Sequence, residues 1–158
     1  MSLLPYFEWC ENSAVGGAIR GSLWLFPVIE SFHLLALALI GGAILVVDLR
    51  LLGLGLRRQP VRLLAREAQP WLVGGLVVMV VSGILLFASE AIKCYYSPAF
   101  WSKMTFLFPA MVFTFTVRRR VAAAEAGLRP WRGKLVAAVS LILWSGVGAS
   151  GRWIGFSG

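Results

Sequence analysis

Four ionisable residues stand inside or near the ends of long apolar stretches, where their chemistry would be that of a buried polar site. Glu30 and His33 are three residues apart, which puts them on one face of a helix. Lys103 and Arg152 belong to two other stretches. Ionisable groups inside a membrane are costly and by default mark a function or a specific partner. We therefore expect Glu30, His33, Lys103 and Arg152 to form a polar pocket. The alternative is that these charges pair for stability alone.

His33 is the only histidine, and it lies about 15 Å into the first stretch at the rise of an α-helix. Haem irons take His/His or His/Met axial ligands, so His33 with Met111, or the His33 residues of two protomers, could hold a haem b. The simpler alternative is a hydrogen bond from His33 to a neighbouring helix, for example to Ser145 or Glu30. No CxxC motif or Cys/His cluster predicts a structural metal site, and no hydrolase or nucleotide-binding motif is present.

The elements that must position these residues are four apolar spans. The chain has 158 residues, of which 59% are hydrophobic, whereas soluble domains have roughly 45–50%. A membrane-spanning helix needs about 20 mainly apolar residues. We expect spans at about 23–52, 70–91, 99–117 and 135–154, with Pro70 opening the second and a short surface helix at 61–67 before it. The predicted fold is a single all-α domain over residues 1–158, an integral membrane four-helix bundle with a short interfacial N-terminal helix.

Lys and Arg are distributed unevenly between the two sides of these spans. Eleven of the 15 fall in the two segments that share one side. They are Arg50, Arg57, Arg58, Arg62, Arg66, Arg118, Arg119, Arg120, Arg129, Arg132 and Lys134. Positive residues near span ends tend to stay cytoplasmic, so we expect both termini in the periplasm. Topology and anionic lipid headgroups account for the net charge of +8, and a nucleic-acid partner is not expected.

The predicted orientation places both cysteines on the same side of the membrane. Cys10 precedes the first span and Cys94 lies between the second and third, so both are expected on the oxidising side. They could form a disulfide bridge or remain two free thiols. On the opposite side, Asp48 is expected to be solvated near the end of span one and to neutralise one of the arginines. Pro109 is expected to kink span three.

Four stretches carry a resemblance that covers almost the whole chain. They are residues 26–33 (FPVIESFH), 48–54 (DLRLLGL), 98–103 (PAFWSK) and 150–154 (SGRWI). The chain resembles an uncharacterised family of small four-span bacterial inner-membrane proteins, a domain of unknown function. That family is similar in outline to CopD-like and cytochrome b561-like membrane domains. The resemblance implies a four-helix membrane bundle and no established activity. Many relatives carry a second histidine near the end of span three, where this chain reads FTVR at 115–118.

The sequence favours a non-enzymatic inner-membrane subunit or interaction module with a periplasm-facing polar pocket. Its expected partners are membrane lipids and other membrane helices, including further copies of itself. The first alternative is a b-type haem electron-transfer protein that uses His33 as an axial ligand. The second is a carrier for a small ion or molecule that works as an oligomer.

Overall fold

The computed structural model describes residues 3–55, 58–124 and 129–156, so Arg57 of the charge pattern lies outside the described residues. Throughout the described residues the regular structure is helical. In chain order the helices are α1 (Leu4–Glu11), α2 (Ala14–Arg20), α3 (Leu25–Leu52), α4 (Val61–Ser89), α5 (Ala91–Tyr96), α6 (Pro98–Phe113), the π-helical segment η1 (Thr114–Arg118), α7 (Arg119–Ala123) and α8 (Pro130–Ile154).

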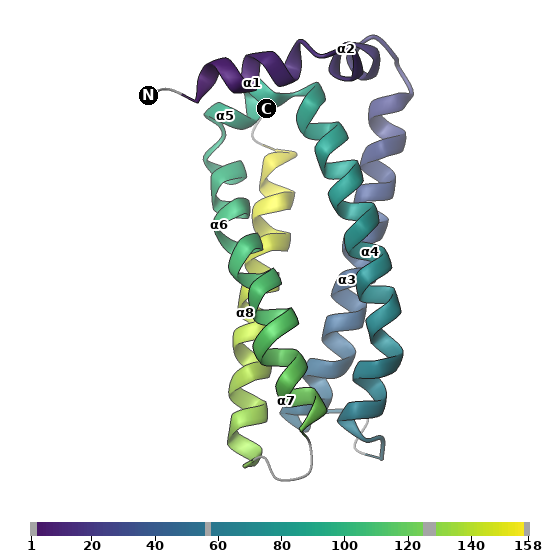
Figure 1. The fold of residues 1–158 in the computed structure, drawn as a ribbon, viewed down its shortest axis with the longest axis vertical. Helices are drawn as coiled ribbons and strands as arrows, with labels where there is room; N and C mark the ends of the chain where they lie inside the picture. The colour runs from purple at the N-terminus through teal and green to yellow at the C-terminus, as the bar shows by residue number, and fades with distance from the viewer. Residues whose placement is uncertain (1–2, 56–57, 125–128, 157–158) are drawn as a thin grey trace.

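Four long helical units are long and apolar enough to cross a membrane: α3, α4, the continuous run from α6 through α7, and α8. They stand side by side, with α3 packed on α4 and α8, and α6 packed on α8 (Figure 1). The short helices α1, α2 and α5 lie across one end of this bundle, here called the α1 end (Figure 1). The opposite end is called the α7 end. The predictions of an all-helical fold and of a multi-pass membrane protein are confirmed.

The second span begins earlier than predicted. α4 starts at Val61 and runs through Pro70 without a break, so the separate surface helix expected at 61–67 is the first part of α4. Proline removes one backbone hydrogen bond inside a helix, but α4 continues past this position. Val61 is buried in a small cluster with Val47 and Ala122, which anchors the start of α4 against α3 and α7.

The third span also differs from the prediction. It was expected to end at Val117, but the helix continues to Ala123 through η1. Pro109 lies inside α6, and the π-helical turn begins five residues later at Thr114. Arg118, the first residue beyond the predicted span, is 6% exposed inside the bundle.

The main core lies between the four long helices. Ile40, Leu76, Met79, Ala110 and Trp144 are among its buried members, and they come from α3, α4, α6 and α8. Glycine allows close approach at the contact of α3 with α4. A Cβ atom added at Gly75 would lie 2.9 Å from Cγ1 of Ile40. The lengthwise faces that point out of the bundle carry many large exposed apolar side chains, as expected for contact with lipid, and Glu30 on α3 is an exposed exception.

Candidate functional site

His33 and Lys103 meet inside the bundle, in its α1 half. Lys103 Nζ of α6 lies 3.4 Å from Nε2 of His33 on α3, and both side chains are partly buried. Two residues that are 70 apart in the chain are thus brought into contact across the bundle. The pairing is part of the predicted pocket.

Ser82 of α4 fixes the other side of the His33 ring. Its Oγ lies 2.8 Å from His33 Nδ1 and 2.6 Å from the carbonyl oxygen of Val78. A carbonyl can only accept, so the serine hydroxyl donates to Val78 and accepts from Nδ1–H. The neutral ring then has a lone pair at Nε2, and Lys103 donates to it. The result is one directed series of hydrogen bonds from Lys103 through His33 and Ser82 to the backbone of α4.

α8 closes this site with small residues. Ser150 Oγ lies 3.0 Å from Ser102 Oγ, beside Lys103 on α6. A Cβ atom at Gly151 would contact Nζ of Lys103 at 3.8 Å, so the lysine lies along this helix. All four spans therefore contribute to one polar layer, defined as His33, Ser82, Ser102, Lys103 and Ser150.

Glu30 and Arg152, the other two residues of the predicted pocket, are not in the polar layer. Both are exposed. Arg152 lies over the ring of Phe156, with Cζ 4.8 Å from the ring centroid. Glu30 has no hydrogen-bond or ion-pair partner among the described residues. The buried residues of α3 nearest the polar layer are Ala36 and Ile40, and Glu30 lies about 60° round the helix from His33, on the side away from Ala36.

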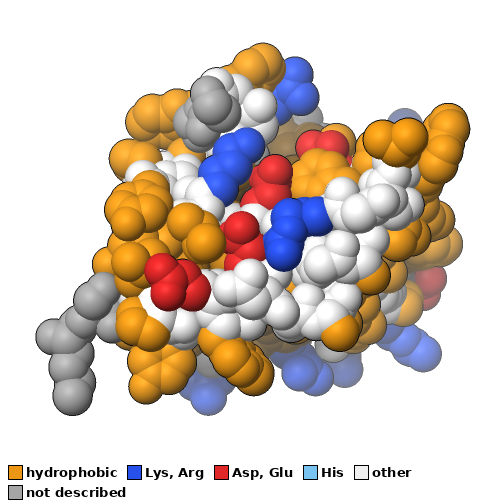
Figure 2. Space-filling model, turned by 90° about the horizontal axis from the view of Figure 1, so that it is seen from above, with side chains coloured by type: hydrophobic (Ala, Val, Ile, Leu, Met, Phe, Trp, Pro, Cys, Tyr) orange, Lys and Arg blue, Asp and Glu red, His pale blue; other side chains and the backbone are white. Residues whose placement is uncertain are grey.

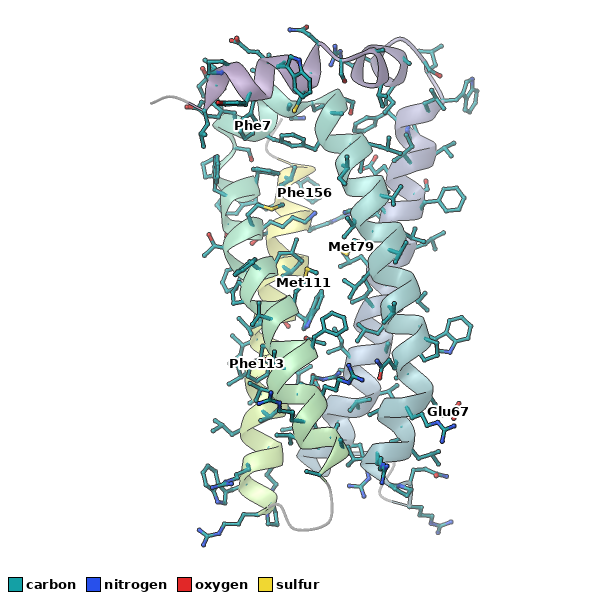
Figure 3. All side chains as sticks on the ribbon, in the orientation of Figure 1. Phe7, Glu67, Met79, Met111, Phe113 and Phe156 are labelled. Atoms are coloured by element: carbon teal, nitrogen blue, oxygen red, sulfur yellow. The ribbon has the colours of Figure 1, made fainter. Side chains whose placement is uncertain are left out.

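The residues around His33 do not offer a free axial nitrogen for a haem. Nδ1 is engaged by Ser82 and Nε2 by Lys103, so iron ligation would require the lysine to leave. Met111 is half-buried on α6 and makes no described contact with His33, and Met79 belongs to the apolar core (Figure 3). Among the described residues no group of three or more His, Cys, Asp or Glu side chains could hold a metal ion. Haem binding stays a prediction, and it carries the cost of displacing Lys103.

The α1 end of the bundle is covered by a hydrogen-bonded cap, defined as α1, α2 and α5. Arg20 donates to the carbonyl oxygens of Ser89 and Glu11, at 3.0 and 2.6 Å. The Glu11 carboxylate accepts from the backbone of Ile92 at 2.6 Å. Seen from this end, acidic side chains gather at the centre beside Lys and Arg side chains (Figure 2). The cap therefore covers the end of the bundle nearest the polar layer.

Aromatic packing fastens α1 to the rest of the cap. The Phe7 ring contacts Phe87 and Tyr95 edge-on, each at a centroid distance of 5.2 Å (Figure 3). Cys10 of α1 and Cys94 of α5 carry free thiols in the structure, and a bridge between them stays a prediction. Burial, together with the nearby Glu90 carboxylate, raises the pKa of the Cys94 thiol to about 11.

Sequence reasoning missed a second buried contact, in the α7 half of the bundle. Asp48 is fully buried, and Arg118 Nε donates to its Oδ1 at 2.7 Å. Arg118 Nη2 also donates to the carbonyl oxygen of Ile44 at 3.0 Å. The expectation that Asp48 is solvated is wrong, although it does neutralise an arginine. The contact could have been suspected from the predicted spans. Asp48 comes before the end of the first span, at about the same depth as Arg118 at the end of the third.

Four apolar helices with ionisable contacts between them define a multi-pass membrane protein of the helical-bundle class. The chain belongs to the Family of unknown function (DUF6644), whose model matches residues 6–157. The predicted membership of an uncharacterised four-span family is thereby confirmed. No curated protein and no solved structure matches the chain. The likeness to CopD-like and cytochrome b561-like domains stays a prediction.

Proposed function

We propose that this protein is a non-enzymatic subunit of the bacterial inner membrane that docks through α3 against another membrane helix. In this proposal both termini face the periplasm, since the basic residues concentrate at the α7 end. The polar layer then lies in the periplasmic half of the bundle, beneath the cap.

The observation that carries the proposal is the exposed carboxylate of Glu30. It lies six residues after Trp24, or roughly 9 Å along α3, and indole rings such as that of Trp24 favour the membrane interface. A carboxylate at this depth on an outward face is costly unless a partner supplies a donor or a positive charge. The described residues of the same chain supply none, which favours a partner from another chain.

The surroundings of Glu30 fit a helix as partner. Leu34, Gly41 and Leu45 lie on the same face of α3 as Glu30, and Leu34 and Leu45 are 48% and 45% exposed. Helices associate in lipid through close packing and interhelical polar contacts. An apolar face with one acidic side chain matches a helix that carries Arg, Lys or His at the corresponding depth.

Photo-crosslinking in cells tests this docking face. A photoreactive phenylalanine analogue replaces Leu34 on α3 or, as the control, Ile142 on α8, which is 66% exposed. We expect a discrete protein adduct from position 34, identified by mass spectrometry as a second copy or another membrane protein, and none from position 142. Glu30→Gln should weaken the adduct several-fold. Equal adducts from both positions, or lipid adducts alone at position 34, would overturn the proposal.

A further inference from the structure

A groove opens on the side of the bundle towards the α7 end, away from the polar layer. It lies between α4 on one side and η1 and α7 on the other, with α3 behind, and its volume is about 610 Å³. Its lining includes Arg62, Arg66, Arg118 and Arg119. Among the described residues that line it, none is Asp or Glu. Nitrogen-tipped side chains gather at this end of the molecule, where Glu67 is labelled (Figure 3).

The groove is basic towards the α7 end and apolar deeper in the bundle, and this change is seen on both helices that flank it. On α4, Arg66 is followed by Leu72, which lies about 9 Å deeper in the bundle at the helical rise. On the third span, Arg119 stands nearer the α7 end and Phe115 stands deeper. The wall from α3 is apolar and includes Ala43. One end of the groove therefore suits an anion and the other suits a hydrocarbon chain.

Arg118 makes the charged end rigid. The residue is 6% exposed, and its guanidinium group is fixed by Asp48 and by the carbonyl oxygen of Ile44, through Nε and Nη2. In these described contacts Nη1 is the nitrogen that is not used. A guanidinium held in advance loses little freedom when it binds a phosphate, and the planar group matches phosphate oxygens well. Arg118 also closes the π-helical turn η1, and such turns often occur at functional sites.

We propose that this groove binds an anionic phospholipid, with the phosphate at Arg66, Arg118 and Arg119 and an acyl chain along Ala43 and Leu72. Basic pockets between membrane helices are suited to acidic headgroups. A soluble anion would use the arginines and leave the apolar part of the groove unfilled. The site is independent of the docking face on α3.

Native mass spectrometry of the delipidated full-length protein in detergent tests this site. The probes are phosphatidylglycerol, phosphatidylcholine and glycerol phosphate, which carries the phosphate without acyl chains. We expect phosphatidylglycerol to bind at least tenfold more tightly than either of the others. Arg66→Gln with Arg119→Gln should remove most of this preference. The control pair Arg129→Gln with Arg132→Gln removes the same charge at the same end, outside the groove lining, and should keep the preference.

A second variant tests the apolar part of the groove without changing the charge. Ala43→Phe should fill the space and lower phosphatidylglycerol binding several-fold, with circular dichroism confirming the helical fold. If the groove pair and the control pair lost the preference for phosphatidylglycerol equally, the lipid would be bound by the overall positive charge of this end, and the proposed site would be overturned. Glycerol phosphate binding as tightly as the lipid, or full binding by Ala43→Phe, would overturn the proposal of a lipid occupant.

Discussion

Arg118 Nε donates a 2.7 Å hydrogen bond to Asp48 Oδ1, and this contact joins the third span to the first inside the bundle. The second carboxylate oxygen, Oδ2, and the buried Oγ of Ser140 on α8 make no contact of strict hydrogen-bond geometry among the described residues, although Ser140 lies close enough to act on the Asp48 carboxylate. The burial of the Asp48 carboxylate therefore depends mainly on its contact with Arg118.

Removal of either partner should destabilise the fold strongly. Asp48→Asn or Arg118→Leu leaves one charged group buried alone, which costs about 3–5 kcal/mol. The double variant Asp48→Leu with Arg118→Leu should recover much of that loss, because no isolated charge remains. Thermal unfolding in mild detergent measures the effect. Glu67→Gln, which neutralises an exposed carboxylate on α4, is the control and should change stability by less than about 0.5 kcal/mol.

The imidazole of His33 should carry its proton on Nδ1. Ser82 occupies that nitrogen as an acceptor and Lys103 donates to Nε2. ¹⁵N NMR of histidine-labelled protein should show a protonated Nδ1 and an unprotonated Nε2. Ser82→Ala should perturb the Nδ1 signal and cost about 1–3 kcal/mol, since it leaves a buried donor without a partner. A Soret band that disappears in His33→Ala would contradict this arrangement and support the haem alternative.

Two adjacent glycines provide a matched test of how the cap is seated. A Cβ atom at Gly16 would collide with the carbonyl oxygen of Ala88, whereas one at Gly17 would meet nothing within 4 Å. Gly16→Ala should release α2 from α4, and hydrogen exchange over residues 14–20 should rise. Gly17→Ala should leave exchange unchanged or slow it, because alanine favours helix by up to about 1 kcal/mol. Equal exchange in the two variants would show that α2 is not seated on α4.

Cys94 should react slowly with alkylating reagents at neutral pH. Its thiol pKa is raised from 9.0 to about 11, and only the thiolate is nucleophilic. A shift of this size lowers the thiolate fraction at pH 8 about 100-fold. In Cys10→Ser the iodoacetamide rate should keep rising with pH beyond 9. The same protein unfolded in detergent and urea is the control, and there the rate should be half-maximal near pH 9 and level off above that pH.

Labelling with a membrane-impermeant maleimide checks the proposed orientation. In a Cys10→Ser, Cys94→Ser background, Lys93→Cys reports on the α1 end and Arg132→Cys on the α7 end; both positions are exposed. Cells with a permeabilised outer membrane should label position 93 and spare position 132. Inverted membrane vesicles should give the opposite result. Labelling of position 132 alone in the cells would reverse the proposed topology.

The existence and order of the four spans could be predicted from the sequence. Lipid requires long apolar helices, and the apolar character of a helix can be recognised from consecutive residues alone. The continuity of α4 through Pro70 could not be predicted, since a proline usually marks the start or end of a helix and the packing of Val61 on Val47 and Ala122 joins distant parts of the chain. Within the site, His33 and Lys103 could be predicted as pocket residues because they are ionisable residues within apolar spans. The same pattern could not show that the Glu30 side chain points out of the bundle. The burial of Arg118 could not be predicted either. A run of arginines has the same local sequence pattern whether it faces water or contacts a buried carboxylate on another helix.

The cap also has a consequence for the order of assembly. α1 and α2 are synthesised first, yet they contact Ala88, Phe87 and Ile92, which follow almost the entire second span. These early helices cannot reach their final positions until that later part of the chain has been synthesised and has folded. Membrane insertion must therefore hold the first twenty residues in an undocked form, and their docking reports that the first two spans are in place.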